Sequence, residues 1–478
     1  MVRKKFQDLA YQKGIFRFSV LSHLLSSPPE KGELKAALKN IAEKKHRRPW
    51  DNTESKISLR TLERWYADAR KAPRPTEQLQ PKIRSDKLKF RILSEEHKVW
   101  LIRERNKHLS WSIQLLFDNM VEVKMQLAPP SYSTVLRFMR SKGLVQKINP
   151  RLHRSRRDVR SYEVEFVGEL FHMDFHKGKR QVIDRDGILK TPICMAIIDD
   201  KSRLACHVQW YLNETTEVLC HGFSQAILKR GLPRGFYTDN GSAMKGEELI
   251  EGLEVLGIDK STTLPYAPYQ NGKQESFWQP LEGRLIKMLP TEKRLTLEIL
   301  NEVTQAWVEQ DYHKRIHSEI KETPLHRFMN AKNVLRNAPT VQEIRVAFRT
   351  TVQRTPRKTD STVTLDGIRF QIPNVFSHLN CITLRYARWD LGEAEIVDED
   401  TRKHIETVYP VDKLSNSRGL RGEKSEEFLP IDLVPESDDL LDLRNDNLPP
   451  LLSRCLKEHA RQFPLPTYIS IPQESKMK

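Results

Sequence analysis

The stretch FYTDNGS, residues Phe236–Ser242, decides the fold expected for the middle of this 478-residue chain. Its first three residues, Phe, Tyr and Thr, favour β-structure, and Asp239 follows them immediately. The next residues, Asn, Gly and Ser, are typical of a tight turn. The pattern predicts a short strand that ends at a carboxylate. Because α/β sheets place their ligands at the carboxyl ends of strands, Asp239 is a candidate site residue.

The flanking segments extend this strand into an α/β layer. Helices are expected at Thr215–Lys229, which is followed by Gly231 and Pro233, and at Glu247–Leu256. Strands are expected upstream and just downstream of them, at Leu170–Phe175, Gln181–Asp184, Thr191–Asp199, Ala205–Trp210 and Ser261–Leu264. Strands first and then alternating strands and helices indicate an α/β core of the ribonuclease H type over residues 165–330, although other doubly wound folds share this periodicity.

Two further acids stand in comparable positions. Asp174 lies within the expected strand HMDF, where a buried carboxylate is costly unless it meets a cation or changes its pKa. Glu275 lies one turn inside a helix that opens near Gly272. Three carboxylates make an oxygen-only site that suits Mg²⁺ or Mn²⁺. Two such ions hold the attacking and leaving oxygens of a phosphodiester in line, so catalysis would need no covalent protein nucleophile.

The ordered motifs resemble those of the DDE transposases and retroviral-type integrases. The matching stretches are HMDF at 172–175, IIDDKSR at 197–203, YTDNGS at 237–242, PYAPYQNGKQESFW at 265–278 and WVEQDYHKRIHSEIKETP at 307–324. Thirty-five residues separate Asp239 from Glu275, a spacing typical of that family. The resemblance implies a ribonuclease H-like catalytic core in which Asp174, Asp239 and Glu275 bind two divalent ions.

Several neighbours of the triad have competing interpretations. The resemblance treats Asp199 and Asp200 as parts of a structural turn with Ser202 and Arg203, so they are left out of the site. His172 and His176 share a sheet face with Asp174, but a hard-cation site prefers oxygen ligands. Four residues are candidate DNA contacts whose alternative is ordinary loop hydrogen bonding: Asn240, Gln270, Asn271 and Lys273.

Positive charge is concentrated at the N-terminus. The net charge is +17, and residues 1–160 hold 37 Lys and Arg against 16 Asp and Glu, so nucleic acid is the expected partner of this third. Residues 1–75 are expected to form a helix-turn-helix domain. Its last helix starts at Ser58 and presents Arg60 and Arg64, and a linker is expected from Lys71 to Arg84.

A second helix-turn-helix domain is expected over residues 85–148, although any basic three-helix bundle would give a similar pattern. Its last helix offers Arg137, Arg140 and Lys142 to DNA. The basic run at 151–157, with Arg154, Arg156 and Arg157, suits a strap along a DNA backbone. Retroviral integrases carry a His and Cys zinc module at this end. The chain lacks such a cluster, so insertion-sequence and Mu-type transposases resemble it better.

After the core, short strands at 362–369, 382–386, 393–397 and 404–408 predict a small SH3-like β-barrel over residues 350–415, with a hairpin turn at Asp366–Gly367. The alternative is a β-rich cap that only stabilises the core. Residues 416–478 are rich in acids, Pro and Leu and are expected to be mostly disordered. Mu-type relatives use such tails to meet an ATPase, which makes this tail a candidate docking segment.

The five cysteines show no CxxC pair, and no apolar run is long enough to span a membrane. The expected location is the cytoplasm, at the nucleoid when the protein is bound to DNA. The expected function is a DNA transposase that acts as a homo-oligomer on double-stranded DNA, cleaving element ends and joining the 3'-hydroxyl to target DNA. Two alternatives are a non-catalytic DNA-binding regulator and a nuclease that does not join strands.

Overall fold

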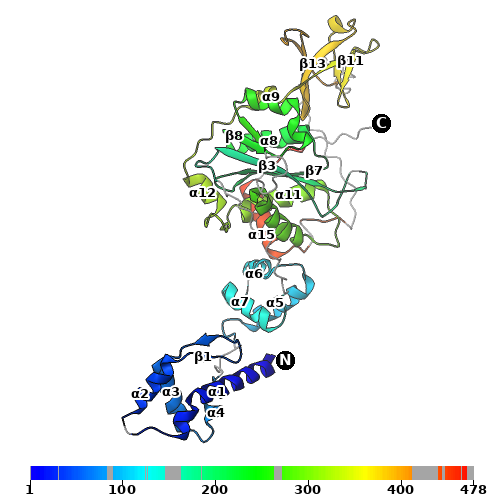
Figure 1. Ribbon diagram of the computed structural model, residues 1–478. Coiled ribbons are helices and arrows are strands. Elements are labelled where there is room, and N and C mark those ends of the chain that lie inside the picture. Colours follow the sequence, from blue (N-terminus) through cyan, green and yellow to red (C-terminus); the bar gives the residue numbers. More distant parts are fainter. Residues whose placement is uncertain are drawn as a thin grey trace. The chain divides into compact units, whose positions relative to one another are not determined.

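A five-stranded mixed sheet forms the centre of the fold (Figure 1). Its order is β7-β6-β3-β8-β9. The pairs β7–β6 and β6–β3 are antiparallel, and the pairs β3–β8 and β8–β9 are parallel. The strand bounds are β3 Leu170–Lys177, β6 Ile193–Asp199, β7 Ala205–Tyr211, β8 Gly235–Thr238 and β9 Asp259–Thr262. The predicted α/β layer is confirmed at this level.

The computed structural model describes residues 2–30, 32–82, 90–123, 125, 128–145, 163–184, 186–262, 272–411, 440–443, 447–463 and 466–470. Within these ranges the chain forms two compact units, Met1–Arg91 and Ile92–Lys478.

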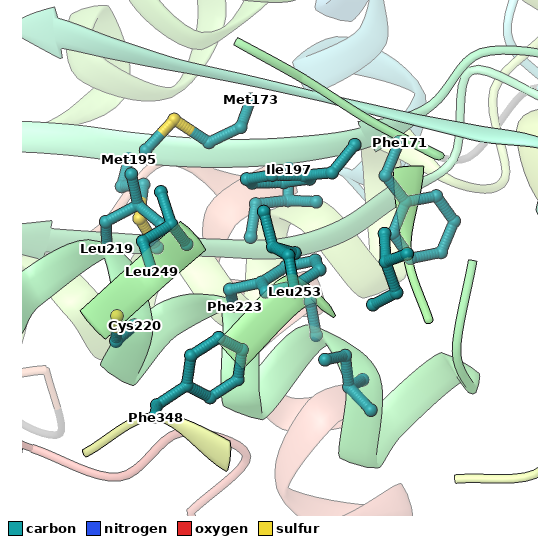
Figure 2. Close-up of a cluster of buried hydrophobic side chains, with 14 of the residues drawn as sticks. Phe171, Met173, Met195, Ile197, Leu219, Cys220, Phe223, Leu249, Leu253 and Phe348 are labelled. Atoms are coloured by element: carbon teal, nitrogen blue, oxygen red, sulfur yellow. The ribbon is translucent and has the colours of Figure 1, made fainter. Parts of the chain in front are cut away.

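Helices cover both faces of the sheet. On one face, α8 (Thr216–Arg230) and α9 (Glu247–Val255) close a large apolar core. Figure 2 shows this core, with Phe171, Met173, Met195 and Ile197 from the sheet packed against side chains of α8 and α9 and against Phe348. The other face is covered by α10 (Gly272–Pro280) and α11 (Leu297–Trp307). Burial on both faces explains why β6 is almost continuously apolar.

The N-terminal unit is helical with one short hairpin. It contains α1 (Val2–Ser26), α2 (Leu34–Glu43), α3 (Leu59–Arg70) and α4 (Pro75–Gln78), and β1 (His46–Arg47) pairs with β2 (Glu54–Ser55). Leu21, Leu38, Leu62 and Trp65 are among its core residues.

The boundary predicted at residue 75 is too early. Helix α4 packs on α1, Leu79 is buried in the same core, and the Arg17 guanidinium donates to the Leu79 carbonyl at 2.9 Å. Pro and basic residues suggested a linker, but the apolar Leu79 ties this segment into the unit.

The second set of helices belongs to the same compact unit as the sheet. Its members are α5 (Glu95–Lys107), α6 (Ile113–Glu122) and α7 (Tyr132–Ser141). Buried Arg105 donates to the carbonyl oxygens of Leu109, Trp111 and Leu144, which ties the ends of these helices together. The Trp111 indole donates to the Lys287 carbonyl beyond α10, so these helices are anchored on the segment that follows α10.

A small β-region follows helix α12 (Pro324–Asn330) and helix α13 (Val341–Ala347). A four-stranded antiparallel sheet, β10-β13-β14-β15, shares one apolar core with the hairpin β11-β12. The bounds are β10 Thr350–Arg354, β11 Thr362–Leu365, β12 Ile368–Gln371, β13 Ile382–Ala387, β14 Asp390–Val397 and β15 His404–Val408. Asp366 and Gly367 both have positive φ, as a tight hairpin turn requires, so that predicted turn is confirmed. The strands form a sheet and a separate hairpin, and closure into a barrel stays a prediction.

The expectation of a mostly disordered tail is wrong for residues 450–462. They form α15 (Pro450–Gln462), which packs on α6 and α11, and its Leu451, Leu452 and Cys455 are buried. Their spacing places them on one face of a helix, and a helix gains stability when such a face finds a partner. The acidic and Pro-rich residues before the helix dominate the composition of the tail, so this short apolar pattern was not recognised from the sequence. Much of the remaining tail lies outside the described residues.

Across the described parts of the chain, no helix has the length and apolar character that a membrane crossing requires.

Candidate metal centre and nucleic-acid interface

Asp174 lies in the middle of β3, opposite Ala196 of β6. Its neighbours Phe171 and Met173 point into the apolar core, so Asp174 faces the side of the sheet that α10 covers. The Trp278 indole N–H of α10 donates to Asp174 Oδ2 at 3.2 Å. Burial raises the Asp174 pKa to about 6; the indole hydrogen bond lowers it, and the charge of Asp239 raises it further.

Asp239 directly follows β8, at the carboxyl end of the strand, as the sequence predicts. Its Oδ1 accepts the Gly241 N–H at 2.9 Å. A Cβ on Gly241 would lie 3.0 Å from the same oxygen, which favours glycine beside this carboxylate. The turn therefore fixes Asp239 at the sheet edge.

Glu214, on the loop between β7 and α8, is a further acid near this edge that sequence reasoning missed. Its pKa is raised, first by burial and then by the charge of Asp239. The only signal in the sequence was its position just after an expected strand, which many surface acids share.

Glu275 lies in the first turn of α10, as predicted, and its side chain is exposed. The neighbouring Gln274 is buried and donates to the His172 carbonyl at 2.8 Å, and Trp278 lies against β3 through Asp174. Trp278 is three residues after Glu275, so the two side chains are neighbours on the helix surface. The helix is thus anchored on β3, with Glu275 beside the residue that contacts Asp174.

The three predicted acids are not assembled into one cluster. Among the described residues, no group of three or more His, Cys, Asp and Glu side chains is close enough to hold an ion. Asp174 and Asp239 do lie close enough for the charge of one to raise the pKa of the other. A carboxylate whose ionisation is opposed by a neighbouring carboxylate fits a hard divalent cation, because a cation would favour both charges. Glu275 is not part of this pair, and its role as the third ligand stays a prediction.

A buried ion network joins the same elements and was not predicted. The His172 ring contacts Asp200 at 2.6 Å, and the Lys273 ammonium of α10 also binds Asp200. These two contacts, together with the charges on both partners, hold the Asp200 pKa well below its usual range despite the opposing effect of burial, which is the largest single influence. Lys273 was expected to contact DNA; its side chain is 12% exposed and paired internally, so a phosphate contact would compete with this ion pair.

The remaining neighbours have structural partners. Asp199 accepts the N–H groups of Gly168 and Ser202, which fits the turn expected there. His176 contacts Glu282 at 3.1 Å and stacks on Trp278. Neither His172 nor His176 is therefore needed to explain a metal site.

The predicted DNA-contact residues fall into three groups. Five lie outside the described residues: Arg154, Arg156, Arg157, Gln270 and Asn271. The following are exposed, on α3, on or just after α7, and on the loop after β8: Arg60, Arg64, Arg137, Arg140, Lys142 and Asn240. Lys273 alone is committed to an internal ion pair among those described. Exposed basic side chains on a helix suit contact with phosphates, and their role in DNA binding stays a prediction.

No family model matches the chain. Its sequence is 22% identical over 251 residues to the transposase of transposon Tn552 from Staphylococcus aureus, which covers 46% of this chain and 49% of that protein. The chain therefore spans about half the length of this curated relative.

Solved structures with partial similarity include the simian T-cell lymphotropic virus intasome in complex with the PP2A regulatory subunit B56 gamma. That match has a TM-score of 0.30 and 17% identity and covers 59% of this chain and 89% of the other. The catalytic core domain of BIV integrase matches with a TM-score of 0.26 and 20% identity, over 34% of this chain and 94% of the other. The HTLV-2 integrase catalytic core domain in complex with magnesium matches with a TM-score of 0.26 and 17% identity, over 34% and 97%.

The sequence match to a transposase agrees with the order of motifs along the chain and with the acids at the sheet edge. Over about half of its length, the chain is thus similar in sequence to a transposase.

Proposed function

We propose that the protein is a DNA transposase that cuts at the ends of a mobile element and joins the freed 3'-hydroxyl to target DNA. The observation that carries this proposal is the pair Asp174 and Asp239 at one edge of a ribonuclease H-like sheet, where the charge of one raises the pKa of the other. An acid pair of this kind is costly to hold in a fold unless a cation uses it.

Asp174 and Asp239 would hold the first divalent ion, and Glu275 would complete a two-ion site for Mg²⁺ or Mn²⁺. The bound ions would supply activation of the attacking oxygen and stabilisation of the leaving oxygen. The protein itself would hold these carboxylates in position. Strand β3 fixes Asp174, the turn at Gly241 fixes Asp239, and the contact of Gln274 with β3 fixes the first turn of α10.

DNA would be recognised largely outside the sheet. The N-terminal unit presents Arg60 and Arg64 on α3, and α7 presents Arg137 and Arg140, all exposed. Two helical elements on one chain suit recognition of a long terminal sequence, and pairing of two element ends would require a homo-oligomer. The protein would then act at the nucleoid of the cytoplasm, and an ATPase partner would use tail residues other than α15.

Incubation of the full chain with Mg²⁺, a target plasmid and a labelled duplex tests the reaction. The duplex carries the terminal sequence of the element that encodes the protein. We expect joined product from the parent and none from Asp239→Asn, while both bind the duplex. Cleavage without joining by the parent would instead favour a nuclease. Binding without either reaction would favour a regulator.

The same duplex tests the interface in the absence of metal. The double variant Arg60→Ala, Arg64→Ala should bind it about tenfold more weakly and with a shallower salt dependence, because two phosphate contacts are lost. Arg103→Ala is the matched control, since Arg103 is exposed on α5 but paired with Glu104. Equal losses in both variants would contradict recognition by α3.

A further inference from the structure

Trp278 of α10 connects the pair Asp174 and Asp239, here called the acid edge, to a second group of side chains. Its indole ring is 7% exposed, and its N–H donates to Asp174 Oδ2 at 3.2 Å. The face of the same ring stacks on the His176 imidazole, with centroids 4.9 Å apart and an angle of 18° between the planes. One ring thus contacts two residues, Asp174 and His176, that project from alternate positions of β3 to the same side of the sheet.

His176 is held from its other side. Its Nε2 lies 3.1 Å from Glu282 Oε1, and Lys179 lies 3.5 Å from the second oxygen of the same carboxylate. Glu282 lies one helical turn after Trp278, in the π-helix η3 (Leu281–Ile286) that continues α10. The chain of contacts therefore runs from Glu282 through His176 and Trp278 to Asp174, and both of its ends are anchored on rigid elements.

We propose that Trp278 is a positioning residue for Asp174, and that His176 and Glu282 hold its ring in place. This inference rests on the proposed function, in which Asp174 is a metal ligand. The indole N–H fixes one carboxylate oxygen, so the other is presented to a cation in a single orientation. An N–H donor suits this task, because it orients a carboxylate without adding a charge that would repel the metal.

The chain offers a matched control for this role. Trp307 of α11 is also buried, and its indole N–H also donates to a carboxylate, Asp311 Oδ2, at 3.0 Å. Asp311 pairs with Arg284 and is not part of the acid edge. Trp278→Phe and Trp307→Phe therefore remove the same kind of hydrogen bond and differ in whether the freed carboxylate is the proposed metal ligand.

The test uses the full chain and measures metal binding without DNA, as the rise in Tm on addition of Mg²⁺ or as Mn²⁺ binding by calorimetry. Trp278→Phe should reach half-maximal metal binding at a metal concentration about 10- to 100-fold higher than the parent, the usual cost of losing a group that orients a ligand. Trp307→Phe should need the same amount as the parent. In the joining assay, Trp278→Phe should shift the half-saturating Mg²⁺ concentration more than the rate at saturating metal.

His176→Phe keeps an aromatic partner for the ring but loses Glu282, and should shift the metal requirement in the same direction by less. This variant keeps the proposal testable if Trp278→Phe folds poorly in EDTA. Equal metal requirements in the Trp278 and Trp307 variants would overturn the positioning role. If that happens while Asp174→Asn abolishes metal binding, the metal site stands without Trp278. If Asp174→Asn binds metal like the parent, the proposed metal site itself is wrong, and the positioning role falls with it.

Discussion

Two places in the core hold titratable groups with displaced pKa values, and they differ in what surrounds them. At the acid edge, burial and Asp239 raise the Asp174 pKa to about 6. Between β7 and α8, burial lowers the Lys229 pKa to about 7, an effect that Glu309 opposes. Lys229 contacts His207 at 3.0 Å, and both lie in a network of polar side chains.

The second place is closed by the chain's own C-terminal region. Gln209 donates to the Ile469 carbonyl at 2.9 Å, and the Ile469 N–H donates to Gln225 at 2.7 Å. The charge of Lys229 also acts on His459 of α15. A displaced pKa marks both places, but of the two only the acid edge combines it with a second carboxylate, Asp239, at the carboxyl end of a strand. A displaced pKa alone is therefore insufficient evidence for a site.

The largest expected effect concerns Glu275, which is exposed in the first turn of α10. Glu275→Gln should lower the rate of strand joining by about 1,000-fold, since a lost metal ligand removes several kcal/mol of transition-state stabilisation. Glu254→Gln, an exposed acid on α9, is the control and should keep the parental rate. The joining assay measures both, and a Glu275 variant with full activity would remove it from the site.

Next in size is an effect on folding at the closed region. Leu452 of α15 is fully buried, so Leu452→Ala should lower the free energy of unfolding by about 2–5 kcal/mol. Urea unfolding measures this change. The joining rate at a temperature where the variant is folded should remain near that of the parent. A stable variant with no activity would show that α15 takes part in the reaction.

The next largest effect is the dependence of stability on pH, which Asp174 should dominate at the acid edge. The folded-state pKa of Asp174, about 6, lies above its ordinary value of 3.8, so its contribution to stability is present below about pH 4 and is lost as pH rises through 6. Asp174→Asn has no such loss. Without metal it should be more stable than the parent by about 1–3 kcal/mol at pH 7 and equally stable at pH 4. Thermal unfolding in EDTA measures the difference, and an advantage that does not grow with pH would contradict it.

The smallest effect on joining activity is expected at Lys229. Its pKa is lowered from 10.5 to about 7, so its contribution to stability is present above about pH 10 and is lost as pH falls through 7. Lys229→Met should gain stability relative to the parent as pH falls over this range, because burial disfavours the charged ammonium that the parent must form. Joining activity should not change. A large loss of activity would make the two places functionally alike.

The sequence alone determined the parts that depend on local pattern. The strand ending at Asp239, the acid within β3, the start of α10 near Gly272 and the Asp366–Gly367 turn are all set by residues close to each other in the chain. Strand periodicity, turn residues and helix boundaries are short-range properties, so they can be read without a fold.

Only the tertiary structure decided which distant groups meet. The Trp278 contact with Asp174, the Lys273 pair with Asp200 and the docking of α15 on α6 and α11 join residues that are tens to hundreds of positions apart. No local signal marks such partners, because a side chain has the same propensity wherever its partner lies. The packing of α10 on β3 and of α15 on the core creates these contacts, and with them the orientation of Asp174 and the order in the tail.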